Sequence, residues 1–474
     1  MWCSPTRRSF ITGRYIVHIT GEQAATDTNL TPLQFTILSE KLAAADYESH
    51  FLGKGHMGWQ TTDHLLVNRG FETHMGYLGG MESYKWGRVD SLLDPSPSVG
   101  QHDMWHNERP GTDIAPLIGY STSFYAMQAV DRIQSRNTSR NLWLHVAFQA
   151  VHAGAHREAA DSCDLLPPDP TGNSKAAENG FRNAGYGSAL HSLDHALRNI
   201  TTALRSAQLW ENTLLWLSSD NGGDNPVGLA SNYPLVGRKC LSWEGGTRTF
   251  SFLSGGLIPP AKRGSVNNQL MHVADWYVTF STLAGVDPND HYLDPQTKLV
   301  HNVDGMNQWP AIVSGKTTPR VLPTTHKSLL HDDGVGHMWK LINGNETRAD
   351  RFLANGTVYE DPHNACLPGD VNGSYGIQFD CQNSLGQHGG GGRMSCVVCS
   401  DEQPCLFDVL ADPGETKNLA KAMPALAASM AATLATFVPY VPELTPGNLE
   451  CYNCSVPASV LWGGYPGPGC TRPQ

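Results

Sequence analysis

The sequence predicts an α/β fold over its first ~300 residues, because short apolar runs alternate there with amphipathic segments, as strands alternate with covering helices. Two apolar runs, residues 142–148 and residues 214–218, are predicted to be buried strands. Between them, apolar residues recur at spacings of three and four, at Leu190, Leu193, Leu197, Ile200 and Leu204. This stripe predicts a helix of about five turns, so we expect a strand-helix-strand unit in one sheet.

A chain of 474 residues is long enough for two unequal domains, because single hydrophobic cores stop growing at about 250 to 300 residues. The prolines between residues 319 and 323 predict a linker. We therefore expect a larger domain over residues 1–320 and a smaller, cysteine-rich domain over residues 321–474.

The second domain is predicted to contain a small antiparallel sheet and a helix. Residues 338–342 and 405–409 are candidate strands, and the helix is expected to begin near Asn418. The long uncharged stretch over residues 423–441 is rich in alanine, serine and threonine and contains two prolines. It therefore predicts a packed helix, and we expect no membrane span.

The charge balance argues against nucleic acid as a partner. A net charge of −11 gives the chain no general attraction to nucleic acid or to anionic membranes. Any anion that the protein binds must therefore be held by a local cluster of basic groups. The hydrophobic content of 40% is ordinary for a folded chain, so disorder is not expected.

The cysteines indicate an oxidising compartment. Eight of the eleven lie between Cys366 and Cys470, which favours disulfides, although the Cys-x-x-Cys pairs that begin at Cys396 and Cys451 would also suit a zinc site. Asn-x-Ser/Thr sequons point the same way, at Asn29, Asn137, Asn199, Asn345, Asn355, Asn372 and Asn453. We expect a disulfide-bonded glycoprotein of the secretory pathway, lysosomal or extracellular.

Polar residues follow both predicted strands, at the sheet edge where ligands collect in α/β folds. Residues 149–152, Gln-Ala-Val-His, follow the first strand, and residues 219–223, Ser-Asp-Asn-Gly-Gly, follow the second. Asp220 and Asn221 offer the hard oxygen donors that Ca²⁺ requires. The same residue types also form ordinary turns after strands.

The most demanding pattern is the string Cys-Ser-Pro-Thr-Arg-Arg-Ser-Phe-Ile-Thr-Gly-Arg-Tyr over residues 3–15. It resembles the first signature of the formylglycine-dependent (type I) sulfatases nearly throughout. Residues 53–58 resemble the second signature, with glycine in place of the usual tryptophan. Residues 68–71 and 76–80 continue as in arylsulfatase B-like proteins, and residues 237–248 match the lysine block of the family.

The resemblance implies an alkaline-phosphatase-like large domain, with a mixed, mainly parallel sheet between helices, and a smaller C-terminal α+β domain with an antiparallel sheet. It also implies that Cys3 is oxidised to formylglycine, whose hydrate attacks sulfur in covalent catalysis. Arg7 and His56 would hold and polarise this nucleophile. His56 is also the implied base that expels sulfate after the transfer.

Three further residues would bind the sulfate group, because negative charge spreads over its oxygens in the transition state. The resemblance assigns this role to Lys54, His152 and Lys239, with Lys239 as the leaving-group acid. His145 and His156 are nearby competitors of His152.

The resemblance implies one Ca²⁺ ion, bound by position 3 together with Asp220 and Asn221. Calcium takes six to eight oxygen ligands, and the family draws a further aspartate pair from a strand that precedes the cysteine. Residues 1–14 also lack the apolar run of a signal peptide. We therefore expect the sequence to be N-terminally incomplete, with both features upstream.

The function that the resemblance implies is hydrolysis of sulfuric esters, arylsulfatase-like, with sulfated glycans among the expected substrates and the formylglycine-generating enzyme as a partner. Two alternatives stay open. One is a phosphonate or phosphodiester hydrolase on the same fold with a different metal set. The other is a non-catalytic, secreted sulfatase-fold glycoprotein that binds sulfated glycans; the intact site residues argue against it, and the incomplete metal set argues for it.

Overall fold

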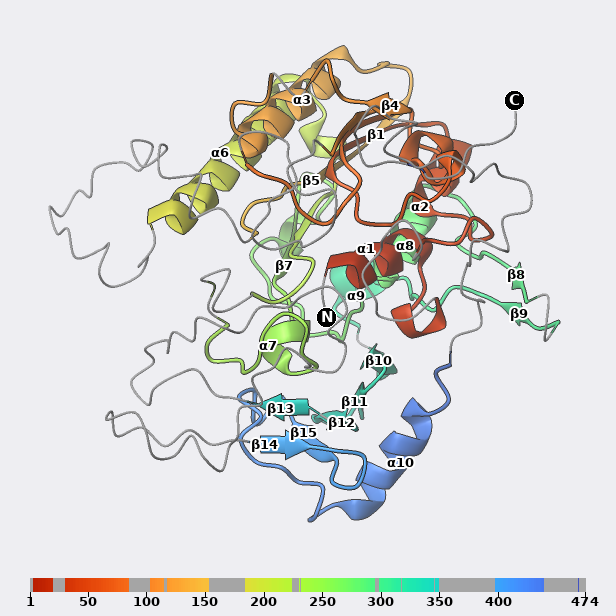
Figure 1. The fold of residues 1–474 in the computed structure, drawn as a ribbon, viewed down its shortest axis with the longest axis vertical. Coiled ribbons are helices and arrows are strands. Elements are labelled where there is room, and N and C mark those ends of the chain that lie inside the picture. Colours follow the sequence, from red (N-terminus) through yellow and green to blue (C-terminus); the bar gives the residue numbers. More distant parts are fainter. Residues whose placement is uncertain are drawn as a thin grey trace, which may run out of the picture.

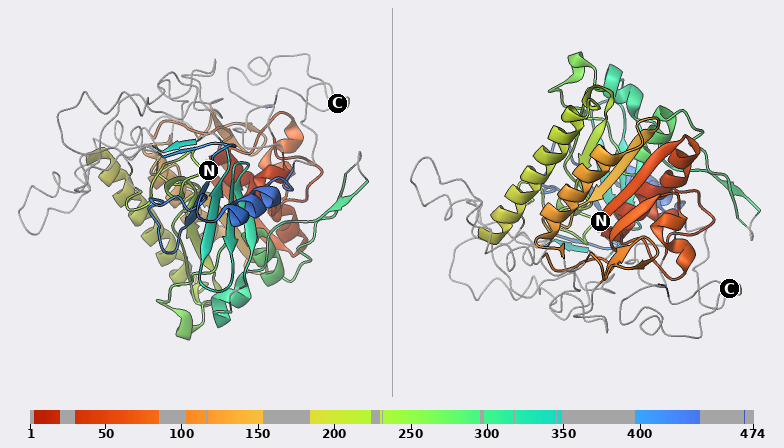
Figure 2. Two further views of the ribbon diagram at one scale, coloured as in Figure 1. Left: turned by 90° about the horizontal axis from the view of Figure 1, so that it is seen from below. Right: turned by 90° about the horizontal axis from the view of Figure 1, so that it is seen from above.

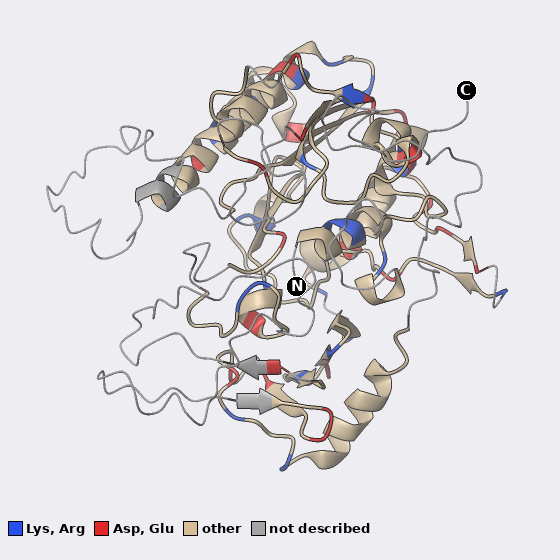
Figure 3. Cartoon of the chain, in the orientation of Figure 1, with Lys and Arg blue, Asp and Glu red and all other residues tan. Residues whose placement is uncertain are grey.

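The computed structural model describes residues 3–19, 30–84, 103–114, 117–152, 184–223, 230, 232–294, 298–316, 318–344, 346–348, 397–438 and 468. Within them, the chain forms an α/β body with a mixed sheet and a separate antiparallel sheet of four strands (Figure 1). The predicted fold class is therefore confirmed. Charged positions of both signs are scattered over both parts of the ribbon (Figure 3).

The mixed sheet has five strands in the order β4-β3-β2-β1-β5. Their bounds are β1 Tyr47–Lys54, β2 Thr73–Tyr77, β3 Met104–His106, β4 Arg109–Pro110 and β5 Asn141–Ala147. Strand β1 runs parallel to both β2 and β5, whereas β3 pairs antiparallel with β2 and with β4. The carboxyl ends of β1 and β5 therefore lie at the same edge of the sheet.

Helices cover both faces of this sheet (Figure 2). The helices of the whole described part of the chain, α10 on the other sheet included, are α1 Cys3–Thr12, α2 Leu38–Ala44, α3 Ser121–Ser135, α6 Ala184–Ser206, α7 Glu244–Thr247, α8 Asp275–Leu283, α9 Trp309–Ser314 and α10 Pro424–Leu434. Helices α3 and α6 pack on the face that carries Leu52, and α1, α2 and α8 pack on the face that carries Phe51. Successive residues of a strand point to opposite faces, so β1 contributes to both cores.

Helix α6 forms where the apolar stripe predicts it. It buries Ile200 and Leu204 in the core shared with α3. Leu190, which the predicted stripe includes, is 42% exposed. The buried residue in that turn is instead Ala189, which packs with Tyr84.

The strand before α6 and the strand after it belong to different sheets in the described residues. Strand β6 Leu215–Ser218 pairs antiparallel with β7 Ser251–Ser254, whereas β5 pairs with β1. This differs from the expected single strand-helix-strand unit. The side chains of β5 and β6 are mostly half-buried, because each strand lies at an edge of its sheet.

The antiparallel sheet has the strand order β10-β11-β12-β15. Its strands are β10 Val321–Thr325, β11 Ser328–Asp332, β12 Met338–Ile342 and β15 Cys405–Asp408. Along β12, Trp339 and Leu341 face α10, and Met338 and Ile342 face the α/β body. Lys340 therefore points toward the body, because side chains alternate along a strand.

Short strand pairs and 3-10 turns complete the described part of the fold. Two further strand pairs are β8 Tyr292–Leu293 with β9 Val300–His301, and β13 Glu346–Arg348 with β14 Val397–Cys399. The 3-10 turns are Ile16–His18, Thr62–His64, Leu66–Asn68, Trp210–Asn212 and Pro260–Lys262. In the described part of the chain, no helix combines the length and apolar character needed to cross a membrane.

Two segments differ in local structure from the sequence-based expectation, and the division into domains after residue 320 stays a prediction. Of the predicted linker over residues 319–323, residues 321–323 belong to β10, and Arg320 is buried in an ion pair with Asp275 at 2.6 Å. The helix expected near Asn418 begins at Pro424. Asn418 accepts a hydrogen bond from the backbone of β15 at 3.0 Å, which keeps it outside the helix.

The described cysteines divide into disulfides and one thiol. Cys399 and Cys405 form a disulfide, so Cys399 is not available for the zinc alternative with Cys396. Cys240 is also disulfide-bonded. Cys3 is a free, buried thiol.

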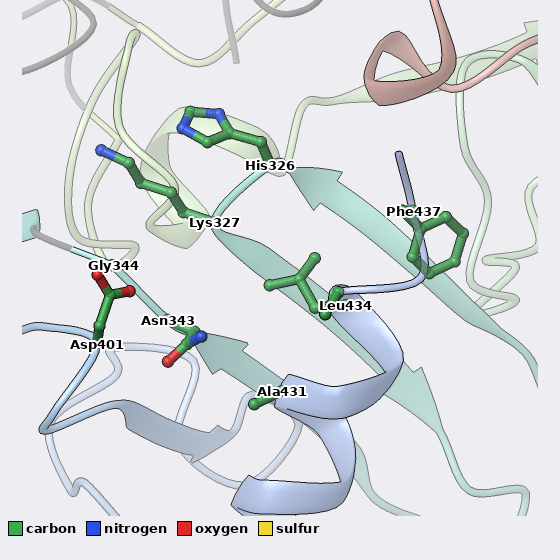
Figure 4. Close-up of a pocket in the computed structure, with 9 residues that line it drawn as sticks. His326, Lys327, Asn343, Gly344, Asp401, Ala431, Leu434 and Phe437 are labelled. Carbon is green, nitrogen blue, oxygen red and sulfur yellow. The ribbon is translucent and has the colours of Figure 1, made fainter. Parts of the chain in front are cut away.

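A cavity of about 460 Å³ lies between the turn that joins β10 to β11 and helix α10 (Figure 4). His326 and Lys327 line it from the turn, and Leu434 and Phe437 line it from the region of α10. No predicted site residue is among those that line it. The candidate chemistry therefore lies elsewhere, around Cys3.

Candidate active site

Cys3 is the first residue of α1 and is 3% exposed. Its side chain hydrogen-bonds with those of His56 and His152, and Lys54 and Lys239 act on it electrostatically. These partners come from the end of β1, the turn after β5 and the segment before α7. The structure thus brings together five of the residues that the sequence singles out.

The surroundings of Cys3 favour negative charge. Burial alone would raise the pKa of the thiol, but Lys239, Lys54 and the two histidines hold that pKa well below its usual value. The amino end of a helix also favours an anion, and Cys3 begins α1. The same positive groups would stabilise negative charge on a substrate bound at this position.

Lys54 ends β1, and its side chain is delivered to the site by the carboxyl end of that strand. It is 2% exposed. Burial lowers the pKa of Lys54; Cys3 and Asp220 oppose this shift, and Arg7 and Lys239 add to it. A bound anion would restore a counter-charge to this ammonium group.

His56 lies in a left-handed conformation with φ of 54°. Gly80 makes room for its ring, because a Cβ at Gly80 would lie 2.6 Å from His56 Cε1. Burial lowers the pKa of His56 to about 4, and its hydrogen bond with Cys3 opposes the shift only in part. The ring is therefore neutral near pH 7 and can accept a proton. Among the described residues, Nδ1 of His56 has no hydrogen-bond partner.

His152 is held by the turn that follows β5. Its backbone N–H donates to Gln149 O at 2.8 Å, and the buried Tyr84 hydroxyl donates to the carbonyl oxygens of Gln149 and His152 at 3.2 and 3.1 Å. Burial lowers the pKa of His152, and Lys239 adds to this shift. Lys239 Nζ lies 3.1 Å from Nε2 of this ring, where a neutral imidazole can accept its proton in a hydrogen bond.

The segments that carry Asp220 and Lys239 are joined through backbone hydrogen bonds. The N–H of Lys239 donates to Gly223 O, and the N–H of Gly222 donates to Gly246 O, both at 3.1 Å. The side chain of Asn232 accepts from the N–H of Gly223 at 2.8 Å and donates to its carbonyl at 3.0 Å. These bonds fix Lys239 relative to the loop after β6.

Arg7 joins α1 to both neighbouring segments. Its Nη2 and Nε donate to Asp220 Oδ2 at 2.9 and 3.2 Å, and its Nη1 donates to the carbonyl of Lys54 at 2.9 Å. Arg7 lies one helical turn after Cys3, so these bonds anchor the start of α1. The contacts place the carboxylate of Asp220 beside the cations of the site.

The residues predicted to bind calcium fit that ion only in part. Asn221 Oδ1 is buried and has no hydrogen-bond partner among the described residues, which suits a cation ligand. Asp220 Oδ2 already accepts two hydrogen bonds from Arg7. Calcium takes six to eight oxygens, and the described ranges contain no group of three or more His, Cys, Asp or Glu placed to hold a metal. They therefore do not form a calcium site by themselves.

Several other candidates have structural roles or fall outside the description. The ring of His145 stacks on Phe51 with centroids 4.5 Å apart, and burial lowers the pKa of His145 to about 3. His156 lies outside the described residues. Arg69, from the stretch that resembles arylsulfatase B-like proteins, pairs with Glu40 at 3.0 Å and so ties that stretch to α2.

The sequence did not identify the residues that contact and position the site residues from the surrounding segments. Gly80 belongs to a stretch already singled out, but its contact with His56 depends on the pairing of distant segments. Tyr84 and Asn232 carry no local signal, because their hydrogen bonds reach backbone groups that the fold alone brings close.

Known sequences resemble this chain over most of its length. The family model described as Sulfatase matches residues 2–286. The chain is 28% identical over 443 residues to arylsulfatase J of Mus musculus, a match that covers 92% of this chain and 68% of that protein. It is 27% identical over 337 residues to N-acetylgalactosamine-6-sulfatase of Canis lupus familiaris, covering 67% of this chain. The chain spans 58% of that second relative's length.

Solved structures share the fold. Ps i-CgsB superimposes with a TM-score of 0.63 at 21% identity, over 94% of this chain and 84% of that chain, and has also been solved in complex with k-i-k-neocarrahexaose. The PsFucS1 sulfatase from Pseudoalteromonas sp. has a TM-score of 0.59 at 18% identity, over 93% of this chain and 82% of that chain. At these identities, the likeness establishes the fold alone.

Proposed function

The chain belongs to the sulfatase family of hydrolases, and we propose that it hydrolyses sulfate esters with a formylglycine formed from Cys3 as the nucleophile. The observation that carries the proposal is the convergence of four protonatable groups on the Cys3 side chain, from Lys54, His56, His152 and Lys239. A sulfate ester is an anion whose transition state spreads charge over several oxygens. Buried positive groups around the nucleophile are what this reaction requires.

In this structure, the thiol of Cys3 stands in for the hydrated aldehyde. Formylglycine would supply a hydroxyl that attacks sulfur and, after the transfer, would return to the aldehyde as sulfate leaves. Lys54, His152 and Lys239 would bind the sulfate oxygens. Asp220, held by Arg7, would accept the proton of the attacking hydroxyl.

Protonation of the leaving group and the later release of sulfate would use two different side chains. Lys239 would protonate the leaving oxygen, because its Nζ already donates toward His152 and a bound substrate oxygen can replace that acceptor. His56 would act as the base for sulfate release, since the ring is neutral above about pH 4. The environments thus separate an acid from a base within one site.

Calcium has a limited role in the proposed function. Asp220, Asn221 and the modified position 3 would be the ligands that this chain contributes, and a bound Ca²⁺ would supply positive charge beside the sulfate. The described residues do not complete the site. The proton transfers are therefore assigned to side chains and not to the metal.

For the substrate, we propose sulfate esters of glycans. One relative is an N-acetylgalactosamine-6-sulfatase, and one structural neighbour has been solved in complex with k-i-k-neocarrahexaose. Residues 68–71 and 76–80 resemble arylsulfatase B-like proteins. This resemblance favours an enzyme close to that group, with the sugar and linkage open to assay.

We further propose that the protein matures in the secretory pathway and acts in a lysosome or outside the cell. The Cys399–Cys405 disulfide supports an oxidising compartment. Asn137 and Asn199 are exposed sequon residues and can accept glycans. The formylglycine-generating enzyme would be the partner that converts Cys3.

The proposal is tested by turnover of matched esters. Protein co-expressed with the formylglycine-generating enzyme is assayed with 4-nitrophenyl sulfate, 4-nitrophenyl phosphate and a phosphodiester, beside the Cys3→Ala variant. We expect hydrolysis of the sulfate ester, and a loss of at least about 10³-fold in the variant. Turnover of the phosphodiester in preference would favour the phosphodiesterase alternative and contradict the proposal.

The non-catalytic alternative is favoured by one observation, the incomplete metal set among the described residues. It predicts that the chain binds sulfated glycans while Cys3 stays a thiol and no sulfate is released. Released sulfate, measured by ion chromatography on the same sample that binds glycan, separates the two functions.

A further inference from the structure

Lys239 is carried by a closed turn of the backbone, residues 236–246, which we call the Lys239 turn. The N–H of Gly245 donates to Val236 O at 2.6 Å, and the N–H of Leu241 donates to Arg238 O at 3.0 Å. Through Gly222 and Gly223, the turn is also bonded to the loop after β6. A shift of one part of the turn is therefore expected to move Lys239 as well.

Glu346 of β13 holds the middle of this turn from outside the site. Its carboxylate oxygens accept hydrogen bonds from the backbone N–H of Ser242 at 2.9 and 3.2 Å, and one also accepts from the Ser242 hydroxyl. Ser242 is fully buried, and Glu346 is 8% exposed. Hydrogen bonds to a charged carboxylate are stronger and more directional than apolar contacts.

A buried ionic cluster holds the end of the turn, where α7 begins. Lys340 Nζ of β12 lies 2.9 Å from Glu244 Oε1 and 3.1 Å from Glu415 Oε1. The second oxygen of Glu415 accepts a hydrogen bond from the backbone N–H of Glu244 at 2.8 Å. We call Lys340, Glu244 and Glu415 the Lys340 cluster. All three are 3% exposed or less.

Both contacts come from the C-terminal part of the chain. Figure 1 shows α7 between the α/β body and the antiparallel sheet. Trp243, between the two bonded backbone groups, packs on Phe407 of β15 with ring centroids 5.7 Å apart. The C-terminal part of the chain thus contacts the Lys239 turn through one aromatic pair and two sets of charged hydrogen bonds, one from Glu346 of the β13–β14 pair and one from Lys340 of β12 with Glu415.

We propose that the C-terminal part of the chain positions Lys239 for catalysis, with Lys340 of β12, Glu346 of β13 and Glu415 after β15 as positioning residues that act through the Lys239 turn. The inference rests on the proposed function, in which Lys239 protonates the leaving group. Loss of Lys340 leaves the buried carboxylates of Glu244 and Glu415 without the ammonium group that they share, and relaxation of the turn moves Lys239. These C-terminal residues then affect catalysis through the position of Lys239.

The test compares two neighbouring positions on β12. Lys340→Met breaks the Lys340 cluster, and Leu341→Ala removes a fully buried side chain from the opposite face, which packs on α10. Both changes weaken the same sheet. The Lys340 change alone reaches the Lys239 turn, so Leu341→Ala controls for general destabilisation.

The first readout is the dependence of kcat on the leaving group, which a purely structural role would not change. A 4-nitrophenolate leaves without a proton, whereas a sugar alkoxide needs the acid. In Lys340→Met, kcat for a sugar sulfate is expected to fall about 10-fold or more, with kcat for 4-nitrophenyl sulfate changed less than about threefold. The double variant with Lys239→Ala should lose no more than Lys239→Ala alone. Leu341→Ala should leave the ratio of the two kcat values unchanged.

The second readout needs no turnover. Acetylation of Lys239 by an N-hydroxysuccinimide ester, followed by peptide mass spectrometry, is expected to be faster in Lys340→Met than in the wild type and in Leu341→Ala. If the wild type hydrolyses neither substrate, the proposed function fails, and this labelling alone decides on the positioning role. A folded Lys340→Met protein with wild-type labelling overturns the proposal.

A milder change covers the case in which Lys340→Met does not fold. Glu346→Gln keeps the size of the side chain and removes the charge that Ser242 contacts. It should shift the kcat ratio and the labelling of Lys239 in the same directions. Unchanged values in a folded Glu346→Gln protein would likewise overturn the proposal.

Discussion

Lys54 and Lys340 are buried to a similar extent, at 2% and 0% exposed, yet their surroundings shift the pKa of the two ammonium groups in opposite directions. Burial lowers the pKa of Lys54, and the nearby Arg7 and Lys239 add to that effect. Burial acts on Lys340 in the same sense, but Glu244 and Glu415 raise its pKa above the usual value. The difference lies in the partners and not in the burial.

This comparison separates a site from its support. Around Cys3, the protonatable side chains face a single point, and Asp220, whose carboxylate acts on Lys54, is shared with Arg7. In the Lys340 cluster, each charge has an opposite partner within 3.1 Å. A buried ammonium whose surroundings lower its pKa has a free-energy cost that a bound anion can offset. We infer that the Lys340 cluster stabilises the fold, and that the cost at Lys54 marks where substrate binds.

The largest effect on stability is expected from Lys340→Met. Removal of the ammonium leaves Glu244 and Glu415 facing each other, so the free energy of unfolding should fall by about 3 to 5 kcal/mol. Urea denaturation monitored by tryptophan fluorescence measures this change. A loss below about 1 kcal/mol would show that the cluster does not hold the fold together.

Lys54→Met should show the reverse pattern. Turnover of 4-nitrophenyl sulfate is expected to fall by about 10² to 10³-fold, since one cation that stabilises the transition state is lost. Stability should stay the same or rise, because a buried ammonium whose pKa is lowered by its surroundings is removed. Denaturation and kinetics on the same preparation check both parts. A strong destabilisation with normal turnover would erase the contrast with Lys340.

The pH dependence of stability tests the titration of one member of the Lys340 cluster, Glu415. Burial raises the pKa of Glu415 from 4.5 to about 7, with Glu244 adding to the shift and Lys340 opposing it. The folded state then binds this proton more tightly than the unfolded state. The resulting stabilisation is complete below about pH 4.5 and is lost as pH rises to about 7.

The wild type should therefore gain up to about 3 kcal/mol relative to Glu415→Gln as pH falls through this window. Urea denaturation of both proteins between pH 4.5 and 7.5 gives the difference directly. Parallel stability curves would mean that Glu415 titrates normally in the folded protein.

The smallest effect concerns the unmodified thiol. Because Lys239 and Lys54 favour an anion at Cys3, iodoacetate should alkylate the unconverted thiol about 10-fold faster than neutral iodoacetamide. Added sulfate should slow the reaction of iodoacetate more than that of iodoacetamide. Mass spectrometry of the Cys3 peptide follows both rates, and equal rates would contradict an anion site.

Local patterns in the sequence were enough to identify the α/β class and the residues around Cys3. The strings at residues 3–15 and 53–58 carry their information within a few positions, and helix α6 follows from one apolar stripe. Strand partners are different, because periodicity identifies a strand and not the neighbour it pairs with. That is why the pairing of β6 with β7, and the position of Val321 in a strand, were not foreseen.

The supporting residues were hidden for a related reason. Glu415 belongs to a stretch, Asp-Pro-Gly-Glu, that looks architectural in the sequence, and Lys340 reads as a polar residue in a short strand. Only the packing of β12 against α7 reveals that they meet Glu244. Buried pairs between distant segments leave no periodic signal, so they require the three-dimensional structure.

The central claim, that Cys3 becomes the nucleophile of a sulfatase, is tested most directly by relating its conversion to turnover. Preparations made with graded amounts of the formylglycine-generating enzyme would be assayed for kcat. Mass spectrometry of the Cys3 peptide would measure the converted fraction from the loss of about 18 Da that accompanies conversion. We predict that kcat for a sulfate ester rises in proportion to the converted fraction, along a line through the origin. Full conversion without turnover, or turnover in protein whose Cys3 is still a thiol, would contradict the account.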